Sequence, residues 1–409
     1  MSTPRTPQTP RTPYEAVLHA ARDVTRVETA LDAEMLGAAL LGSVYAVAKS
    51  SRAVAVRDFV AGFLAETSRR RTPAARAVRT VFAALEPRAA GASRVRPGPQ
   101  PPPWSAQLSR VRPVSTWAYG DVYGDQTSYL ATFAYDDPAV GGEEHAVVAL
   151  VDHNIGIVKD LFVVQPAGLI LDEVRKAAGS DELIWLAEVD PGTLRAQVSF
   201  FLEITDGLAN LPDEGALATD RALVGARLAA LPDADLGPPF PVAAEPGELT
   251  GAFLDSPAAQ GLDRSSDQAE AAVRYAARLI LDFAQDSPDG DPLRWSPAVV
   301  GLFLLDWVHR RAVLDEDDVV ALPPVLRAWT TWAAAQRGLP WSALEATHET
   351  IDTMAPEFAR LHSTGERRGP AVDAVTRLLA DGVDPDDETA VGRWLARTHG
   401  GRYGIPRPR

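Results

Sequence analysis

A strand-like stretch at residues 117–164 limits most strongly what this chain can fold into. Polar and apolar residues alternate there with the period of two that β-strands require, and turn residues such as the Asn-Ile-Gly at 154–156 interrupt the pattern. Consecutive strands joined by short turns pair as antiparallel hairpins. A helix at 167–178, a strand at 182–189 and a further helix follow, which predicts a mainly antiparallel sheet with helices on one face.

The regions on both sides of this stretch have the 3.6-residue period of helices. Four helices with short connections are expected in residues 14–90, where Thr72-Pro73 combines an N-cap with a first-turn proline, and they predict a compact helical bundle. Residues 243–365 predict a helical domain, and 366–409 a C-terminal helical extension with a basic tail. The predicted fold class is therefore α+β, with an N-terminal helical bundle, a central mainly antiparallel α+β domain at 105–232 and a C-terminal all-helical domain.

The C-terminal region gives three specific expectations about where helices begin and which residues are buried. Pro323-Pro324 is expected to begin a helix, because proline is tolerated in the first helical turn. The nearly continuous apolar run 299–308 predicts a helix that is almost fully buried. Asp282 and Asp306 are single acids inside apolar helical runs, so each is expected to be buried and paired with a nearby basic side chain.

Proline-rich sequence indicates where the predicted domains begin and end. Residues 1–13 contain four Thr-Pro pairs and predict a disordered tail. Residues 91–104 are rich in Pro and Gly and predict a semi-rigid linker between the bundle and the central domain. A second linker, rich in Pro and Asp, is expected at 231–245.

Composition excludes several kinds of chemistry. The 409 residues include no cysteine, so disulfides, zinc–thiolate sites, iron–sulfur clusters and cysteine nucleophiles are excluded. The sequence has no P-loop, dinucleotide-binding, HExxH, EF-hand, nucleophile-elbow or protein-kinase signature. The net charge of −15 is unevenly distributed, because residues 1–103 carry a net +7 and residues 104–409 a net −22. This asymmetry favours an acidic partner for the basic segment, or its docking onto the acidic body of the same chain.

The N-terminal sequence also gives an expectation about location. The apolar run at 35–48 is shorter than the roughly 20 residues that a membrane-spanning helix needs. Thr-Pro repeats come before this run, which differs from the charged-then-apolar order of a signal peptide. We therefore expect a cytoplasmic protein that does not bind membranes.

Polar residues within the strand-like stretch are the candidates for catalysis. The five candidate catalytic residues are Asp121, Asp125, Asp152, His153 and Lys159. Carboxylates and an imidazole that converge can hold a divalent metal ion, which activates water, and a carboxylate pair can act in acid–base catalysis. Alternating polar residues are also typical of the solvent-facing side of an antiparallel sheet, and Asp-His-Asn-Ile-Gly suits a turn. We favour this second interpretation and predict no cofactor, with a divalent metal at the central sheet as the alternative.

A group of arginines lies where the third and fourth predicted helices meet. The candidate nucleic-acid-binding residues are Arg69, Arg70, Arg71, Arg76 and Arg79. Clustered guanidinium groups can contact phosphates, so residues 14–103 are a candidate nucleic-acid-binding segment. The simpler interpretation is a solvated helix end.

The leading functional hypothesis is an intracellular, non-enzymatic interaction or regulatory protein with a protein partner. It rests on the missing catalytic signatures, the uneven charge and the proline-rich tail and linker. The first alternative is a metal-assisted hydrolase or nuclease centred on the central sheet. The second is nucleic-acid binding through the basic N-terminal segment. The sequence predicts neither a substrate nor an oligomeric state.

Overall fold

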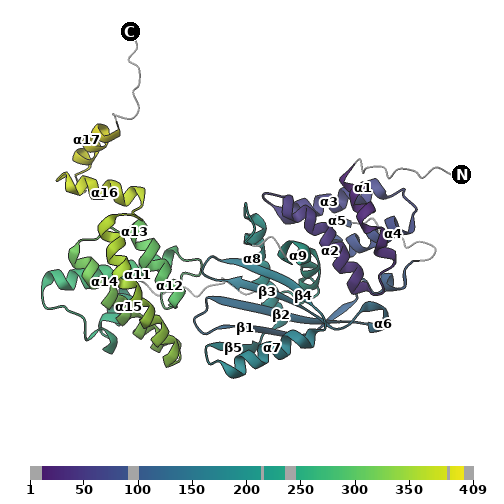
Figure 1. The fold of residues 1–409 in the computed structure, drawn as a ribbon, viewed down its shortest axis with the longest axis horizontal. Helices are drawn as coiled ribbons and strands as arrows, with labels where there is room; N and C mark the ends of the chain where they lie inside the picture. Colours follow the sequence, from purple (N-terminus) through teal and green to yellow (C-terminus); the bar gives the residue numbers. More distant parts are fainter. Residues whose placement is uncertain (1–11, 91–100, 213–215, 235–245, 385–386, 400–409) are drawn as a thin grey trace, which may run out of the picture. The chain divides into compact units, whose positions relative to one another are not determined.

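A computed structural model describes residues 12–90, 101–212, 216–234, 246–384 and 387–399 (Figure 1). The chain divides into two compact units, Met1–Pro239 and Phe240–Arg409, and each is described here by itself. Residues 1–11 of the predicted tail and most of the two predicted linkers lie outside the described residues, as does the basic C-terminal end. The last two residues of the predicted tail are ordered, because Thr12 caps the first helix and Pro13 begins it.

The first unit begins with a series of helices, three of which start after a threonine whose side chain caps the first turn. They are α1 (Pro13–Ala20), a 3₁₀ turn (Ala21–Thr25), α2 (Ala30–Val47), α3 (Arg52–Thr67), α4 (Pro73–Leu85) and α5 (Pro87–Ala90). Thr72 caps α4 by accepting a hydrogen bond from the backbone of Ala75 at 3.3 Å, and Pro73 occupies the first turn. The predicted cap and first-turn proline are therefore confirmed.

The centre of the unit is a five-stranded sheet in which every pair of neighbours is antiparallel. Its strands are β1 (Val111–Asp121), β2 (Gln126–Tyr135), β3 (His145–Asp152), β4 (Ile157–Val164) and β5 (Ile184–Glu188), in the order β4-β3-β2-β1-β5. Short turns join β1 to β2 and β3 to β4, as the turn residues of the sequence predict, and the connection from β2 to β3 contains the one-turn helix α6 (Pro138–Gly141). The predicted antiparallel sheet and the α+β fold class are confirmed.

Helices cover both faces of this sheet, which differs from the prediction of helices on one face. Helices α8 (Pro191–Gly207) and α9 (Ala216–Leu228) lie on one side in Figure 1, and α7 (Ala167–Ser180) lies on the other. Phe133 and Val147 belong to the core under α8 and α9. Leu130 and Val148 point to the opposite face of the same two strands and belong to a smaller core with α7. Strands with apolar residues on both faces need cover on both.

The edge strand β4 is closed by side chains from the two helices beside it. The Val158 N–H donates to Thr205 Oγ1 of α8 at 2.9 Å, and the Val163 N–H donates to Asp220 Oδ2 of α9 at 2.9 Å. These bonds satisfy backbone groups that an open edge would offer to another strand. The sheet edge at β4 is therefore partly protected from pairing with another strand.

The bundle and the sheet share a single hydrophobic core. This core includes Leu41 of α2, Phe82 of α4, Phe133 of β2 and Leu223 of α9, all of them buried. The structure thus joins the predicted bundle at 14–90 and the predicted central domain at 105–232 in one compact unit. The remaining segment boundaries stay predictions.

Helix α2 is the one described helix that is long and apolar enough to cross a membrane, judged by length and composition alone. It begins at Ala30, five residues before the apolar run expected from the sequence, and so reaches 18 residues. Half of its residues are buried inside the unit, and its buried side includes the charged Glu34. The core helix of a water-soluble protein has these same properties, so α2 is weak evidence for a membrane span.

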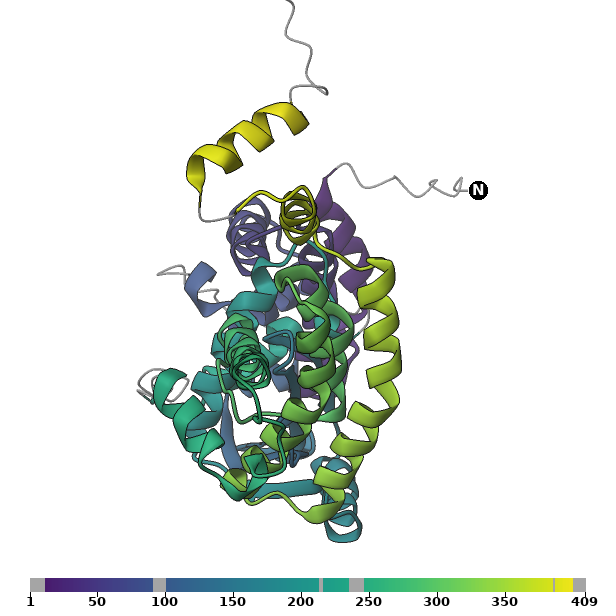
Figure 2. The same cartoon turned by 90° about the vertical axis from the view of Figure 1, so that its left-hand side faces the viewer.

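The second unit is all helical in its described part. Its helices are α10 (Pro246–Leu254), a 3₁₀ turn (Pro257–Ala259), α11 (Asp267–Asp286), α12 (Pro297–Leu302), a π-helical turn (Phe303–Trp307), α13 (Val308–Arg311), α14 (Glu316–Arg337), α15 (Trp341–Thr364), α16 (Pro370–Ala380) and α17 (Glu388–His399). Figure 2 shows the long α15 in yellow-green along one side of this unit. The buried aromatic residues Phe253, Phe303 and Trp329 lie in its core.

The three detailed expectations for this unit are each wrong, at least in part. Pro323-Pro324 lies inside α14, which begins seven residues earlier, where Asp315 and Asp318 form a capping box. Asp306 is paired with Arg310 at 2.8 Å, as expected of a nearby base, but its side chain is 34% exposed rather than buried. Asp282 is paired with Arg278 at 3.6 Å, but its side chain is 42% exposed rather than buried. The helix over 299–308 contains the π-helical turn and is not buried on every side, because Leu302 is 45% exposed.

Candidate functional site

The candidate catalytic residues of the central sheet lie at or next to its hairpin turns, and the side chains of Asp121 and Asp152 bind backbone groups there. Asp121 Oδ1 accepts hydrogen bonds from the N–H groups of Gly124 at 2.8 Å and Asp125 at 3.0 Å, and its Oδ2 accepts one from the Gln126 N–H at 2.8 Å. The carboxylate is therefore engaged by three backbone donors. This arrangement stabilises the turn between β1 and β2.

The other members of that candidate set lie at the neighbouring turn. Asp152 Oδ1 accepts from the Asn154 N–H at 3.0 Å, and Lys159 Nζ lies 3.6 Å from Asp152 Oδ2. His153 Nε2 is 3.0 Å from Thr127 Oγ1, and the His153 N–H donates to the carbonyl of Asp125 at 2.8 Å. The structure brings these residues to the same end of the sheet. Among the residues it describes, no group of three or more His, Asp or Glu side chains is placed to hold a metal ion.

The five candidate nucleic-acid-binding arginines do not form one exposed patch. The Arg79 side chain is buried and donates to the backbone carbonyls of Thr67 and Arg70, so it holds the α3–α4 connection. Arg70 forms an ion pair with Glu15 at 3.0 Å. Arg69 and Arg71 are exposed, and Arg76 is half-buried.

A buried polar network, which the sequence analysis missed, ties the bundle to the sheet. Arg227 of α9 donates from Nη2 to Glu34 of α2 and to the Tyr135 hydroxyl of β2, and from Nε to His145 Nε2 of β3 at 2.8 Å. All four side chains are at most 3% exposed. Since every member has a partner within the network, we assign it to structure rather than to ligand binding.

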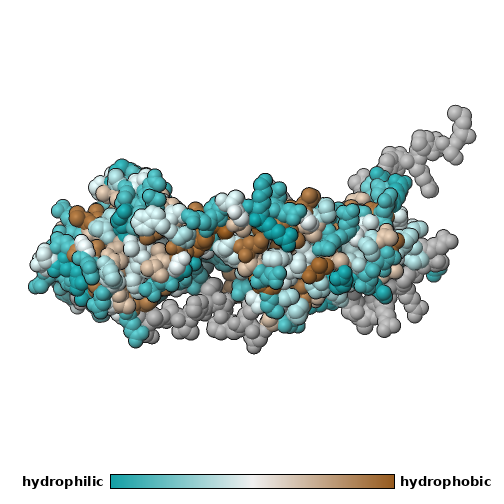
Figure 3. All heavy atoms as spheres, turned by 90° about the horizontal axis from the view of Figure 1, so that it is seen from below, coloured by the Kyte–Doolittle hydropathy of each residue, from teal (hydrophilic) through white to brown (hydrophobic). Residues whose placement is uncertain are grey.

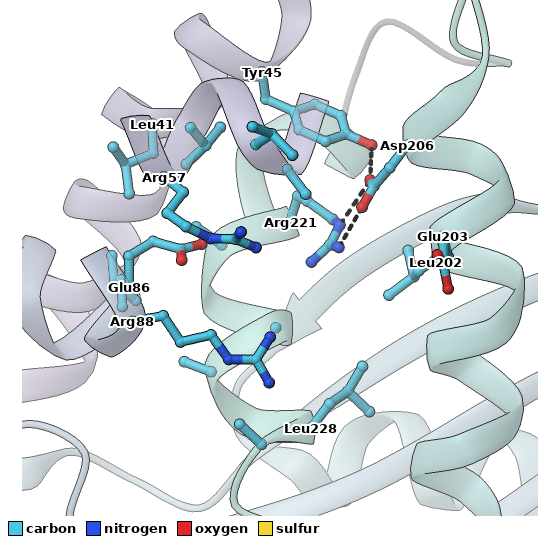
Figure 4. A pocket seen from close by; sticks show the side chains of 18 of the residues that line it. Leu41, Tyr45, Arg57, Glu86, Arg88, Leu202, Glu203, Asp206, Arg221 and Leu228 are labelled. Carbon is cyan, nitrogen blue, oxygen red and sulfur yellow. Dashed lines mark hydrogen bonds and ion pairs between the residues drawn. The ribbon is translucent and has the colours of Figure 1, made fainter. Parts of the chain in front are cut away.

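A cavity of about 650 Å³ lies beside this network in the same unit, between α2, α3 and α5 on one side and α8 and α9 on the other (Figure 4). Its volume lies within the range of about 300–1,000 Å³ that is usual for small-molecule sites. Part of its lining is aliphatic, including Leu41, Leu202 and Leu228. The rest is charged.

One carboxylate in the cavity is fully engaged. Asp206 of α8 accepts from the Tyr45 hydroxyl at 2.6 Å and from Arg221 Nε and Nη2 at 3.1 and 2.6 Å. Burial and the adjacent Asp206 raise the pKa of Tyr45, so the phenol stays protonated and donates. Burial alone would lower the pKa of Arg221, but Asp206 raises it above its ordinary value. Asp206 thus positions the Arg221 side chain by a bidentate ion pair.

Three guanidinium groups enter the cavity with donors that remain unused. Figure 4 shows Arg57 from α3, Arg88 from α5 and Arg221 from α9 directed toward the same open space. The Nε of Arg57 is buried and has no hydrogen-bond partner among the described residues. Within the same described part of the chain, Arg88 forms no hydrogen bond or ion pair, and Arg221 Nη1 forms no hydrogen bond.

The remaining charged residues of the cavity neutralise this group only in part. Arg195 is already engaged by the carbonyl of Leu231 at 2.7 Å and by Asp233 at 2.8 Å. Glu203 is exposed to solvent. Glu86 lies next to the arginines, and burial raises the pKa of its carboxyl, although Arg221, Arg57 and Arg88 offset part of this effect. The cavity therefore presents more unused cationic donors than acceptors.

The sequence carries one weak indication of this cavity, namely two arginines on helices whose inner sides are largely apolar. Arg57 and Arg221 lie on helices that are otherwise largely apolar or small on their inner sides, 164 positions apart. Nothing local connects them, because the cavity forms only when α3 and α9 pack near the same face of the sheet. Unmatched arginines in core helices are the feature that a sequence search could have noted.

The chain was also compared with known proteins. No family model, no curated protein and no solved structure matches it. The geometry of the cavity is therefore the basis for the proposal that follows.

Proposed function

We propose that this chain is a non-enzymatic regulatory protein whose first unit binds a small, negatively charged molecule in the cavity. One observation carries the proposal: Arg57, Arg88 and Arg221 direct unused donors into a single cavity of small-molecule size. Guanidinium groups bind carboxylate and phosphate oxygens with two parallel hydrogen bonds, so these anions match the donors. The aliphatic part of the lining then contacts the remainder of the ligand.

The energetic argument concerns the buried part of Arg57. A buried donor without a partner costs roughly 1–3 kcal/mol, and more when the group is charged. An anion in the cavity beside the Arg57 guanidinium offsets part of this cost in the bound state through its charge. The free protein therefore carries a free-energy cost at Arg57 that ligand binding reduces.

The position of the cavity supports a regulatory role. Arg57 and Arg88 belong to the bundle, whereas Arg221 lies on α9, which packs against β4 of the sheet. A ligand that contacts all three arginines stabilises the packing of the bundle on α8 and α9. Binding free energy can shift a conformational equilibrium only through such differential contacts.

Protein interaction remains part of this proposal, with the cytoplasm as its location. On the face drawn in Figure 3, described hydrophobic residues form small patches among hydrophilic ones. Such patches are ordinary for a water-soluble surface and do not by themselves indicate a docking site. The metal-dependent hydrolase and the nucleic-acid hypotheses stay predictions, and both have less support because Asp121 binds backbone groups and Arg79 is buried.

Native mass spectrometry of the full, untagged chain tests the proposal. The protein is purified without phosphate or sulfate, and its mass is compared with the mass of Arg57→Met and Arg88→Met variants. The matched control is Arg112→Met, which removes an exposed arginine of β1 outside the cavity. We expect a bound small molecule, or an increase in melting temperature with added anions, that the two cavity variants lose and the control keeps. Equal behaviour of all four proteins would contradict the proposal.

A further inference from the structure

Glu86 faces the same guanidinium groups that would hold the ligand. The residue lies at the junction of α4 and α5, where its backbone N–H donates to the carbonyl of Phe82 at 2.9 Å. Its carboxylate accepts no hydrogen bond from the described residues. Arg57, Arg88 and Arg221 each stabilise its charged form. In the free protein, Glu86 therefore acts as the counter-charge of these arginines.

The other charged and titratable groups of the cavity come from every helix around it. They are Tyr45 of α2, Arg57 of α3, Arg88 of α5, Arg195, Glu203 and Asp206 of α8 and Arg221 of α9. The described lining contains no histidine. Arginine stays charged at all relevant pH values, Asp206 is held by two partners, and Glu203 is in contact with solvent. Glu86 is thus the half-buried carboxylate whose charge depends on whether the three arginines interact with it or with a bound anion.

We infer that the cavity takes up its anionic ligand together with one proton, and that the carboxylate of Glu86 receives this proton. The inference rests on the proposed function, because it concerns the same site. A ligand anion occupies the donors of Arg57, Arg88 and Arg221 and places a second negative charge beside Glu86. Both changes favour the protonated carboxyl. The proton comes from bulk water, and no covalent bond of the ligand changes.

Protonation also adds a hydrogen-bond donor to the cavity. The O–H of a protonated glutamic acid donates to an anionic oxygen, which the ionised carboxylate cannot do. The preferred ligand class is therefore an oxyanion with several acceptor oxygens, such as a carboxylate or a phosphate group. Its affinity rises as the pH falls between the pKa of Glu86 in the complex and the lower pKa in the free protein.

Equilibrium dialysis of the full chain with radiolabelled sulfate tests this coupling. Sulfate is a suitable probe because it does not itself titrate between about pH 5 and pH 8, and ionic strength is held constant with chloride. For the wild-type protein we expect the dissociation constant to fall with decreasing pH, by at most tenfold per pH unit for one proton. In Glu86→Gln, whose neutral amide resembles the protonated acid, binding should be as tight as in the wild type at low pH and independent of pH.

A second variant distinguishes the two carboxylates near the arginines. Glu203→Gln should keep the pH dependence of the wild type, and loss of that dependence in this variant instead would overturn the assignment to Glu86. Sulfate binding that needs Arg57 but does not change with pH would overturn the coupled proton and leave the proposed function standing. If neither sulfate nor phosphate nor acetate binds to the wild-type chain at any pH, the proposed function itself fails.

Discussion

Arg227 donates a hydrogen bond from Nε to Nε2 of His145 at 2.8 Å, and both side chains are at most 1% exposed. Because Nε2 accepts, the ring proton is on Nδ1, which lies 3.3 Å from the carbonyl of Glu143. Burial and the charge of Arg227 lower the pKa of His145 from its usual 6.5 to about 3. The imidazole is therefore neutral in the folded protein throughout the physiological range.

This neutral histidine predicts that the first unit loses stability in mild acid. Below the ordinary histidine pKa the unfolded chain binds a proton at His145, whereas the folded chain does not until about pH 3. Stability therefore falls as the pH drops, by about 2 kcal/mol between pH 7 and pH 5. The free energy of unfolding of the first unit is measured at each pH by hydrogen exchange of the β3 backbone amides in increasing urea. His145→Gln should reduce the pH dependence, and His19→Gln, at an exposed position in α1, should not.

Removing the carboxylate partner of Arg227 should strongly destabilise the first unit. Glu34→Ala leaves the Arg227 charge buried and removes the acceptor of the Ser109 N–H, so we expect a loss of roughly 3–5 kcal/mol. The double variant Glu34→Leu/Arg227→Met should lose less, because no unpaired charge remains. Denaturant unfolding of the three proteins gives the comparison. A double variant less stable than Glu34→Ala would contradict this account of the network.

The close contact of α2 with α9 depends on a glycine. A Cβ at position 42 would lie 2.5 Å from the Ala218 carbonyl oxygen and 2.9 Å from the Cα of Thr219, and neither backbone atom can move independently of α9. Gly42→Ala should therefore cost about 1–3 kcal/mol despite the better helix propensity of alanine. Gly168→Ala in α7 is the control, because no atom lies within 4 Å of its added Cβ. Thermal unfolding of both variants tests the expectation, and an equal melting temperature would refute it.

Asp121 is expected to act on the β1–β2 turn rather than on a substrate. Asp121→Ala removes the acceptor of three backbone N–H groups and should cost about 1–3 kcal/mol. Asp172→Ala in α7 is a suitable control, since this carboxylate is 81% exposed and such surface pairs contribute little. Circular dichroism during thermal unfolding distinguishes them. Unchanged stability of Asp121→Ala, together with loss of a bound divalent metal, would instead favour the hydrolase hypothesis.

Local sequence patterns predicted most elements because their causes are local. The strands expected at 145–152 and 157–164 coincide with β3 and β4, and the cap at Thr72 begins α4. The same reasoning failed at Pro323-Pro324, because the capping box at Asp315 and Asp318 starts the helix earlier. Val320, whose carbonyl would have bonded to the missing N–H of Pro324, is 75% exposed, so water can reach that part of the helix.

Local sequence patterns did not predict which residues line the cavity. The sequence singled out Asp121 and Asp152 as unusual polar residues, and the structure shows that both bind backbone groups at turns. It gave no reason to connect Arg57 with Arg221, since they belong to separate helices and neither position is distinctive alone. Only contacts between distant segments can reveal that both lie on one cavity.

The sequence by itself determined most of the helices, the hairpins and the mainly antiparallel character of the sheet, because hydrophobic period, capping and turn chemistry act over a few residues. Tertiary structure decided that the bundle and the sheet share one core, that Arg227 is matched by Glu34 and His145, and that Arg57 is left without a partner. The physical reason is that burial and charge pairing depend on which helix faces pack together. The contacts of Arg227 with His145 and Glu34 join residues 82 and 193 positions apart in the chain.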